Sequence, residues 1–240
     1  MQAGPVGTVH IFAMTWVKIC ATTNLADAQA SVAAGANALG FIFAPSTRHI
    51  EVSTAAEIIR SLPAEVERIG VFVNEAPERI AVVAQQAGLT GVQLHGDEPA
   101  SQLGEYRRAL GGRKLIKTLQ ARELLTEDGE RRLNEYLDVH DTFDAILLDS
   151  GRPDQRGGTG VPFDWAAAMS IVKRIKAVLP VIIAGGLTAD NVPQAIQMFE
   201  PWGVDVVSGV ELEPGKKDDA RLRSFVDAAR SLHARTSLGA

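Results

Sequence analysis

Short apolar stretches alternate with longer amphipathic stretches along most of this chain. The short stretches are typical of buried strands, whereas the long ones repeat apolar residues at helical spacing. Glycine or proline stands at many of the junctions, as at Gly35, Pro63 and Gly88. The pattern predicts strands at Trp16–Ala21, Ala38–Ala44, Glu67–Val73, Gly91–His95, Lys114–Leu119, Phe143–Asp149, Pro180–Ala184 and Gly203–Ser208. It predicts helices at Leu25–Ala34, Ser53–Leu62, Pro77–Ala87, Pro99–Leu110, Ala121–Val139, Asp164–Val178, Thr188–Phe199 and Asp218–Ala234.

This regular alternation of strand and helix predicts a single-domain (β/α)8 TIM barrel of the α/β class. An open doubly wound sheet is the alternative, but it usually carries a glycine-rich loop after its first strand, where this chain has Cys20-Ala21-Thr22-Thr23. We expect residues 1–15 to be a flexible N-terminal extension, residues 16–234 to form the barrel, and residues 235–240 to be a C-terminal tail. The loops after the second and sixth strands are the longest, so we expect them to cover the active site.

Composition and charge argue against several classes of protein. The chain has 240 residues, a net charge of −5 and one cysteine. An acidic chain has no general attraction to nucleic acid, and one cysteine cannot form an intramolecular disulfide or a cysteine-rich metal site. No apolar stretch approaches the roughly 18–20 residues of a membrane-spanning helix, and residues 1–13 lack the Lys or Arg of a secretory signal. We therefore expect a cytoplasmic protein without nucleic-acid or membrane partners.

The first predicted strand has one unusual face. Alternation places Val17 and Ile19 on one side and Lys18 and Cys20 on the other. A barrel core favours apolar side chains, so an ammonium and a thiol on the same face are unexpected. A lone cysteine is more often a small buried hydrophobic residue than a reactive thiol. This face alone therefore does not identify a site.

Glycine-containing turns follow two neighbouring strands. Gly185-Gly186 come after the seventh predicted strand, and Ser208-Gly209 come at the end of the eighth. Their exposed backbone N–H groups lie where many barrels bind phosphate. Glycine can also simply turn the chain, but two such turns after adjacent strands favour a phosphate site.

Further polar residues stand where the predicted strands end. Gln93 and His95 close the fourth strand, Asp149 closes the sixth, and Arg48 lies in the loop after the second. Asp149 can serve as an acid/base group or as an anchor for the loop that follows it. Histidine inside a barrel is more often a hydrogen-bonded core residue than a catalyst, so we expect Gln93 and His95 to be supporting residues. Cys20 and Asp149 together offer two titratable groups of different chemistry, as general acid–base catalysis requires.

A series of motifs runs in order along nearly the whole chain from residue 17. They are Val17-Lys18-Ile19-Cys20 with Thr23-Asn24, Gly40-Phe41-Ile42-Phe43, Ser46-Thr47-Arg48, Gly70-Val71-Phe72-Val73, Gly91-Val92-Gln93-Leu94-His95-Gly96-Asp97-Glu98, Leu148-Asp149-Ser150, Gly157-Gly158-Thr159-Gly160, Phe163-Asp164-Trp165, Ala184-Gly185-Gly186-Leu187, Asn191-Val192 and Ser208-Gly209-Val210-Glu211. Together they resemble the phosphoribosylanthranilate isomerase family of tryptophan biosynthesis. No single motif is specific, but their combination in this order is.

The resemblance implies an Amadori rearrangement of a phosphosugar, from N-(5-phosphoribosyl)anthranilate to 1-(2-carboxyphenylamino)-1-deoxyribulose 5-phosphate. By similarity, Asp149 is the general acid that protonates the furanose ring oxygen, and Cys20 is the base that removes the proton from C2. Arg48 would bind the anthranilate carboxylate, because its planar guanidinium matches a carboxylate. The resemblance implies no metal and no organic cofactor, because the substrate nitrogen acts as the electron sink.

A catalytic Cys20 makes a demand on its surroundings. A free thiol has a pKa of about 8.5 and is mostly protonated at neutral pH. We expect Lys18, one step deeper on the same strand face, or Arg48 to favour the thiolate. A buried Lys18 needs an anionic partner of its own. Asp205 is the predicted partner, because its strand, the eighth, neighbours the first in a closed barrel.

The chain departs from the usual family pattern at several positions that bear on the site. Ala21 stands where the family commonly has glycine, and it would be strained if this backbone needs a positive φ. Thr47 and His49 replace a common proline and tyrosine, and Val207 replaces a common serine. The acid, the base and the arginine are all retained, so we expect these changes to affect rate and phosphate affinity rather than the type of reaction.

Two other functions stay open at this stage. The related isomerase of histidine biosynthesis carries out the same chemistry on a larger bisphosphorylated substrate, but that family resembles a duplicated half-barrel and has aspartate where this chain has Cys20. The other alternative is a non-catalytic barrel that only binds a phosphorylated ligand. The pattern is equally compatible with a monomer and with a homodimer.

Overall fold

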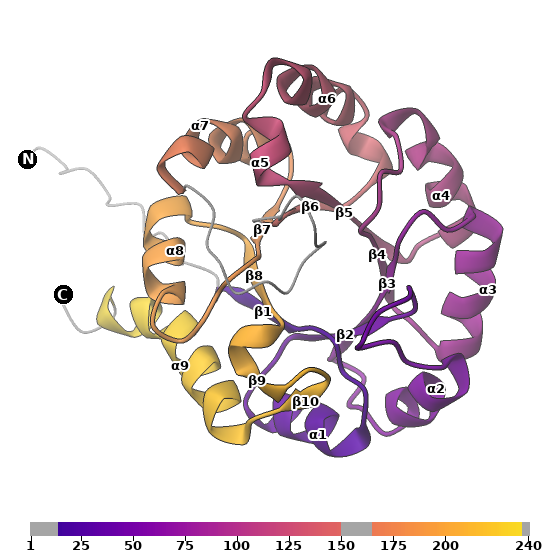
Figure 1. Cartoon of the computed structure of the whole chain (residues 1–240), viewed down its shortest axis with the longest axis vertical. Coiled ribbons are helices and arrows are strands. Elements are labelled where there is room, and N and C mark those ends of the chain that lie inside the picture. Colours follow the sequence, from indigo (N-terminus) through magenta and orange to yellow (C-terminus); the bar gives the residue numbers. More distant parts are fainter. Residues whose placement is uncertain (1–13, 150–164, 237–240) are drawn as a thin grey trace, which may run out of the picture.

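Parallel strands close into a barrel in chain order in the computed structural model, which describes residues 14–149 and 165–236. The strands are β1 (Trp16–Ile19), β2 (Ala38–Ile42), β3 (Glu67–Phe72), β4 (Gly91–Leu94), β5 (Lys114–Gln120), β6 (Ala145–Asp149), β7 (Val181–Ile183) and β8 (Gly203–Val206). Each strand pairs with its neighbours in the sequence, and β8 closes the ring by pairing with β1. Figure 1 shows this ring viewed along its axis, with the helices arranged around it. The predicted (β/α)8 barrel is confirmed, and the open sheet is excluded.

Helices connect successive strands on the outside of the ring. They are α1 (Leu25–Ala33), α2 (Val52–Arg60), α3 (Pro77–Ala87), α4 (Leu103–Leu110), α5 (Ala121–Leu124), α6 (Glu127–Asp138), α7 (Trp165–Lys176), α8 (Val192–Phe199) and α9 (Asp219–Thr236), with single 3-10 turns at η1 (Ala100–Gln102), η2 (His140–Thr142) and η3 (Ser208–Val210). Local signals set their ends. The Asn24 side chain caps α1 by accepting from the Asp27 N–H, and Gly88 ends α3 in the left-handed conformation, with a φ of 75°.

Alternation along the strands separates two apolar regions. Trp16 faces the barrel interior, where it packs with Ala38, Ile69, Ile116, Ala145, Leu147, Ile182 and Ala184. Val17 and Ile19 face the helices and belong to the larger core between strands and helices. Because apolar burial is worth about 25 cal/mol per Å², this outer layer supplies most of the driving force for folding. The interior above Trp16 is left to polar groups.

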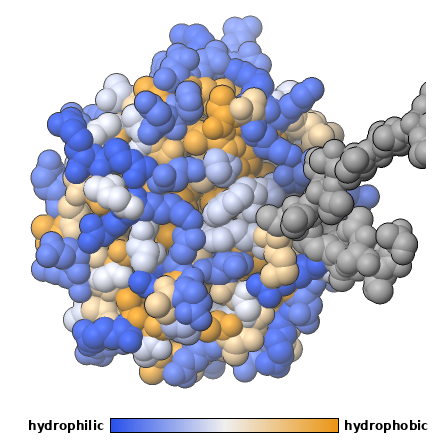
Figure 2. All heavy atoms as spheres, turned by 180° about the vertical axis from the view of Figure 1, so that it is seen from behind, coloured by the Kyte–Doolittle hydropathy of each residue, from blue (hydrophilic) through white to orange (hydrophobic). Residues whose placement is uncertain are grey.

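The amino-terminal end of the barrel is closed by aromatic rings. Trp16 stacks on Trp202 with 4.8 Å between ring centroids, and the Lys114 ammonium lies 4.9 Å from the Trp202 ring and 2.7 Å from Glu67. Seen from behind, the molecule presents hydrophilic side chains around an apolar area (Figure 2). The opposite end, where the strands finish, is therefore the one available for a site.

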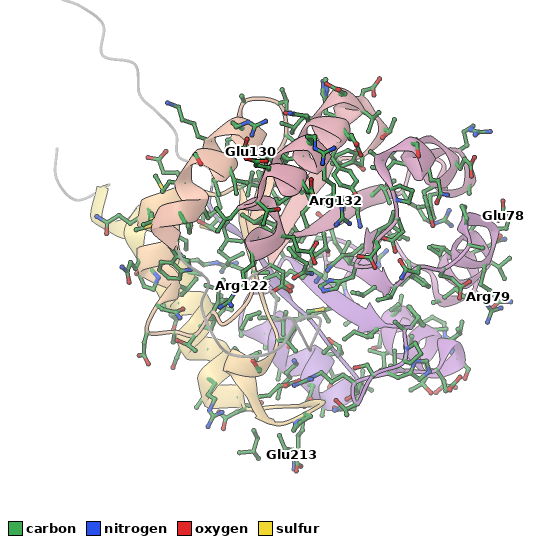
Figure 3. The ribbon with its side chains drawn as sticks, turned by 45° about the horizontal axis from the view of Figure 1, so that its top comes forward. Glu78, Arg79, Arg122, Glu130, Arg132 and Glu213 are labelled. Carbon is green, nitrogen blue, oxygen red and sulfur yellow. The ribbon has the colours of Figure 1, made fainter. Side chains whose placement is uncertain are left out.

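The charged segment after β5 forms an outer surface. Arg122 and Glu130 are exposed on α5 and α6, with Glu130 on the outer helix and Arg122 closer to the ring of strands (Figure 3). Arg132 is half-buried and pairs with Glu123 at 3.0 Å. No chemistry is indicated for this face.

A small hairpin follows β8 that the sequence pattern did not predict. Its strands β9 (Glu211–Glu213) and β10 (Lys216–Lys217) pair antiparallel, and the turn between them is Pro214-Gly215. Gly215 has a φ of 83°, which suits the left-handed position of a tight turn after proline. The hairpin lies at the rim of the ring beside α1 (Figure 1).

Some of the expectations concern residues outside the described ranges. They are the extension up to residue 13, the long loop 150–162 with its glycine-rich motif, and the tail from residue 237. Helix α9 continues to Thr236, beyond the expected end of the barrel at residue 234. Among the described residues, no helix combines the length and the apolar character needed to cross a membrane.

Candidate active site

A cavity of about 470 Å³ opens where the strands end. Its polar lining consists of Cys20, Ser46, Arg48, Gln93, His95, Asp149 and Asp205, and its apolar lining consists of Ile42, Ala44, Pro45, Val71, Val73 and Val207. A mostly apolar wall with a few convergent polar groups is typical of sites for small molecules. The barrel therefore brings six of the candidates chosen from the sequence to one place.

Cys20 directly follows β1 and is 3% exposed. Its N–H donates to the Val206 carbonyl on β8 at 2.9 Å, which fixes the backbone at the strand end. Gly40 on β2 makes room for the thiol, because a Cβ there would come within 2.5 Å of Cys20 Sγ. Burial raises the pKa of the Cys20 thiol, and the nearby Lys18 and Lys217 offset this only in part. Lys18 therefore favours the thiolate as expected, but the second cation is Lys217, which the sequence analysis did not identify.

Lys18 and Asp205 form a buried ion pair inside the barrel. They are direct partners in the β1–β8 register, and Lys18 Nζ lies 2.8 Å from Asp205 Oδ1. Burial by itself would lower the pKa of Lys18, but Asp205 and Cys20 outweigh it, so the net pKa is raised and the ammonium stays charged. The predicted pairing is confirmed.

Gln93, His95 and Asp149 lie in a row in the cavity wall. Gln93 Nε2 donates to Thr118 Oγ1 at 3.1 Å and contacts His95 Nδ1 at 2.9 Å. With Gln93 Nε2 as the donor to Nδ1, the neutral ring carries its proton on Nε2. Nε2 faces Asp149 Oδ2 at 3.7 Å. Burial lowers the pKa of His95, while Asp149 acts in the opposite direction.

Arg48 is held by a carboxylate that the sequence analysis did not identify. Its Nε lies 3.0 Å from both carboxylate oxygens of Glu211, and its Nη2 lies 2.7 Å from Oε2. Burial alone would raise the pKa of Glu211, but the hydrogen bonds from Arg48, together with Lys217 and the Gly215 N–H, lower it overall. The loop itself is stabilised by a hydrogen bond from the Arg48 N–H to Ser46 Oγ at 3.0 Å. Arg48 thus lines the cavity in a fixed orientation.

The glycine turns after β7 and β8 lie against each other. Gly185 and Gly186 both have positive φ, at 84° and 66°, which glycine adopts without strain. A Cβ on Gly209 would lie 2.0 Å from the Leu187 carbonyl oxygen, so only glycine allows this contact. Ser208 begins the short helix η3 and directly follows the cavity residue Val207. The structure therefore brings the two predicted turns together beside the cavity.

Glu211 and Lys217 are the functional candidates that sequence reasoning missed. A Pro-Gly turn between short segments rich in Glu and Lys was the available signal for a hairpin. The segment lies between the last predicted strand and the last predicted helix, where the periodicity predicts no element. Within residues 14–149 and 165–236, no group of three or more His, Cys, Asp or Glu side chains is arranged to hold a metal ion.

Comparison with known proteins identifies relatives of this barrel. A family model described as N-(5'phosphoribosyl)anthranilate (PRA) isomerase matches residues 17–228. The N-(5'-phosphoribosyl)anthranilate isomerase of Rubrobacter xylanophilus is 41% identical over 219 residues, which cover 91% of this chain and 100% of that protein. The enzyme of the same name from Desulforudis audaxviator is 43% identical over 217 residues, covering 90% of this chain and 98% of that protein.

Solved structures agree with these sequence matches. Phosphoribosyl anthranilate isomerase from Thermotoga maritima superimposes with a TM-score of 0.77 at 41% identity, covering 91% of this chain and 100% of that one. A phosphoribosyl anthranilate isomerase in complex with reduced 1-(o-carboxyphenylamino)-1-deoxyribulose 5-phosphate gives a TM-score of 0.74 at 38% identity, with the same coverage. The chain belongs to the N-(5'-phosphoribosyl)anthranilate isomerase family.

Proposed function

We propose that this protein is the isomerase that converts N-(5'-phosphoribosyl)anthranilate to 1-(2-carboxyphenylamino)-1-deoxyribulose 5-phosphate in tryptophan biosynthesis. The observation that carries the proposal is the placement of Cys20 and Asp149 in one cavity. Cys20 directly follows β1 and Asp149 ends β6, and β7 and β8 lie between these two strands in the ring (Figure 1). Membership of the family and the solved relative with a bound carboxyphenylamino-deoxyribulose phosphate support the same reaction.

Asp149 is the proposed general acid. A proton delivered from its carboxyl group to the furanose ring oxygen breaks the C1–O bond and leaves an iminium on the anthranilate nitrogen. His95 Nε2 faces this carboxyl group, 3.7 Å from Asp149 Oδ2, and His95 is its proposed supporting residue. The apolar wall of the cavity limits competing water, which strengthens the interactions of the Asp149 carboxyl group with His95 and with the ring oxygen.

Cys20 is the proposed general base. Its thiolate removes the proton from C2 of the opened sugar, and the electron pair moves into the C1–C2 bond and onto the nitrogen. The resulting enolamine then tautomerises to the ketose. Because burial raises the pKa of the thiol, the cations Lys18 and Lys217 are needed to keep a usable fraction of thiolate.

The two ends of the substrate are anionic, and the site offers a partner for each. Arg48 in the cavity wall is the proposed ligand of the anthranilate carboxylate. Backbone N–H groups in the turns at Gly185, Gly186, Ser208 and Gly209 are the proposed phosphate ligands. Binding both ends fixes C1 and C2 between the acid and the base.

Assembly and location are part of the proposal. One of the similar structures is that of monomers generated from the dimeric phosphoribosylanthranilate isomerase of Thermotoga maritima. We propose a monomer or a homodimer for this chain, which gel filtration with light scattering distinguishes. We also propose a cytoplasmic location, in line with the biosynthetic reaction that membership of the family supports.

One assay tests the reaction. Phosphoribosylanthranilate is generated in situ, and loss of its fluorescence is followed with the wild type, Cys20→Ala and Asp149→Asn. We expect turnover by the wild type and a loss of at least about 100-fold in each variant, with circular dichroism confirming that both variants fold. A wild type that binds substrate without turnover is the non-catalytic barrel, and the isomerase proposal then fails. Full activity in Cys20→Ala means that the base is wrongly assigned.

A further inference from the structure

Lys217 is a buried lysine close to the proposed base. The proposed reaction uses it only as a positive charge near the thiol and gives it no contact with the substrate. Its ammonium donates to the Cys20 carbonyl oxygen at 2.6 Å and lies 3.3 Å from Glu211 Oε1. The side chain has no exposed area. Its backbone N–H donates to Asp27 Oδ2 at 2.8 Å, which ties the hairpin to α1.

Glu211 joins this lysine to the arginine of the cavity. One carboxylate contacts Lys217 at 3.3 Å and Arg48 at 2.7 Å, and it also accepts from the Gly215 N–H at 3.1 Å. The Arg48 and Glu211 side chains are 17% and 3% exposed. The result is a buried chain of charges that runs from the Cys20 carbonyl through Lys217 and Glu211 to Arg48.

A hairpin does not need such a chain for its stability. Removing charges from water costs several kcal/mol per ion, and a buried pair often contributes no more than apolar residues of the same size. Burial lowers the pKa of Lys217, although Glu211 acts in the opposite direction. Exposed Glu213 and Lys216 occupy the same two strands and meet only at 3.8 Å. The charges at positions 211 and 217 therefore call for an explanation beyond folding.

At its Cys20 end, this chain of charges contacts a constrained part of the backbone. Ala21, directly after Cys20, has a φ of 64° and is fully buried, a conformation that costs about 1–2 kcal/mol for a residue with a Cβ. The Cys20 carbonyl belongs to the peptide group that leads into Ala21. By binding this carbonyl, Lys217 holds the peptide orientation on which the direction of the thiol depends.

The Arg48 end acts on the substrate ligand. Glu211 engages Nε and Nη2 of the guanidinium. Within the described ranges, no hydrogen bond is made by Nη1. Because Arg48 also lines the cavity, Glu211 holds one edge of the guanidinium and leaves the other for an incoming carboxylate.

We propose that Lys217 and Glu211 are positioning residues that fix the Cys20 thiol and the Arg48 guanidinium relative to each other. This inference rests on the proposed isomerase reaction, in which Arg48 binds the carboxylate while Cys20 approaches C2. A shift of about 1 Å between an anchor and a catalytic group can cost about 100-fold in rate. The contacts of Lys217 and Glu211 prevent such a shift of Cys20 relative to Arg48 before the substrate binds.

The hairpin offers matched controls for a test. Lys217→Met is compared with Lys216→Met, and Glu211→Gln with Glu213→Gln, since each pair has one buried and one exposed member of the same strand. Glu213 points away from the barrel (Figure 3). We expect Lys217→Met to lower kcat by about 10- to 100-fold with a smaller change in KM, and Glu211→Gln to raise KM as well, while both controls stay within about 2-fold of the wild type.

A second readout separates positioning from general stability. Cys20 is the only cysteine, so the pH dependence of its alkylation by iodoacetamide reports the ionisation of this thiol, whereas the rate at the plateau also reflects access to it. The charged groups that act on it are Lys18, Asp205 and Lys217, and loss of the cation at 217 is expected to move thiolate formation to higher pH. In a Cys20→Ala background, Lys217→Met is expected to cause little further loss of kcat.

The outcomes are distinct. No turnover by the wild type contradicts the proposed function itself. The positioning role is overturned if the wild type turns over substrate and the kinetic constants of Lys217→Met and Glu211→Gln match those of their controls. If Lys217→Met does not fold, Lys217→Arg and Glu211→Gln decide: a lower kcat or higher KM with an unchanged melting temperature supports the role, and wild-type kinetics overturn it.

Discussion

Lys18 Nζ lies 2.8 Å from Asp205 Oδ1, directly across the pairing of β1 with β8 that closes the barrel. The two charges stand one step deeper than the Cys20 thiol, next to the apolar layer of the interior that contains Trp16. Two consequences follow. The pair keeps an ammonium next to the thiol, and neither charge can be removed without leaving the other buried and uncompensated.

Lys18→Met is therefore expected to be strongly destabilising. Breaking a buried ion pair by removing one partner typically costs about 3–5 kcal/mol. Lys18→Met/Asp205→Leu removes both charges and is expected to recover much of that loss, although its Cys20 no longer has the neighbouring cation. Urea unfolding measures the stability. A double variant that is no more stable than Lys18→Met would contradict a pairwise account.

The pH dependence of the proposed reaction follows from the thiol. Because the pKa of Cys20 is raised by burial, the thiolate fraction grows with pH well beyond neutrality. We expect kcat/KM to rise from pH 7 to about pH 9, where an ordinary thiol, with a pKa of about 8.5, would already be levelling off. A profile that is flat over this range would mean that Cys20 is not the base.

Stability should change in the opposite direction over the same range. Above about pH 8.5 the unfolded chain loses the Cys20 proton while the folded protein keeps it, so the free energy of unfolding falls by up to about 1.4 kcal/mol per pH unit. Cys20→Ser is expected to reduce this slope. Thermal unfolding at several alkaline pH values measures it.

Because of His95, we expect the free energy of unfolding to fall at acidic pH. Burial lowers its pKa in the folded protein, and Lys18 adds to this while Asp149 opposes it. Below about pH 6.5 the unfolded chain takes up this proton first, so stability that is present above that pH is lost as the pH falls. His95→Asn is expected to flatten the slope between about pH 6.5 and pH 5. The exposed His140 gives the matched control, since His140→Asn should leave the slope in place.

Much of this architecture could be predicted from local patterns. Strands and helices followed from periodicity, and the pairing of Lys18 with Asp205 followed from barrel closure, because both residues lie inside adjacent strands at the same depth. The face of a strand or helix on which a residue lies, and the order of these elements, can be inferred directly from the sequence. The fold and the inward-facing candidates could therefore be predicted from the sequence.

The chain of charges formed by Lys217, Glu211 and Arg48 could not be predicted in the same way. Lys217 and Cys20 are 197 residues apart, and neither periodicity nor barrel register relates a hairpin residue to a strand end. The Arg48–Glu211 contact likewise depends on how the loop after β2 and the β9–β10 hairpin lie relative to each other. The raised pKa of Cys20 was also beyond sequence reasoning, because the balance between burial and two cations depends on their positions in space.

Ala21 gives the sharpest local test of how the site is held. Its φ of 64° is unfavourable for alanine by about 1–2 kcal/mol. Ala21→Gly removes that strain, but it also removes a buried methyl group worth about 0.8 kcal/mol and adds about 0.5–1 kcal/mol of chain entropy to lose on folding.

These contributions offset one another, so Ala21→Gly is expected to change the free energy of unfolding by less than about 1 kcal/mol. Ala21→Val adds a branched side chain in the same conformation without free space and should cost more than about 2 kcal/mol. Ala34, with a φ of −71°, provides the control, because Ala34→Gly relieves no strain and should only destabilise. Urea unfolding distinguishes these cases. If Ala21→Val is as stable as the wild type, the turn after Cys20 can adopt a negative φ, and the thiol is not held by this backbone.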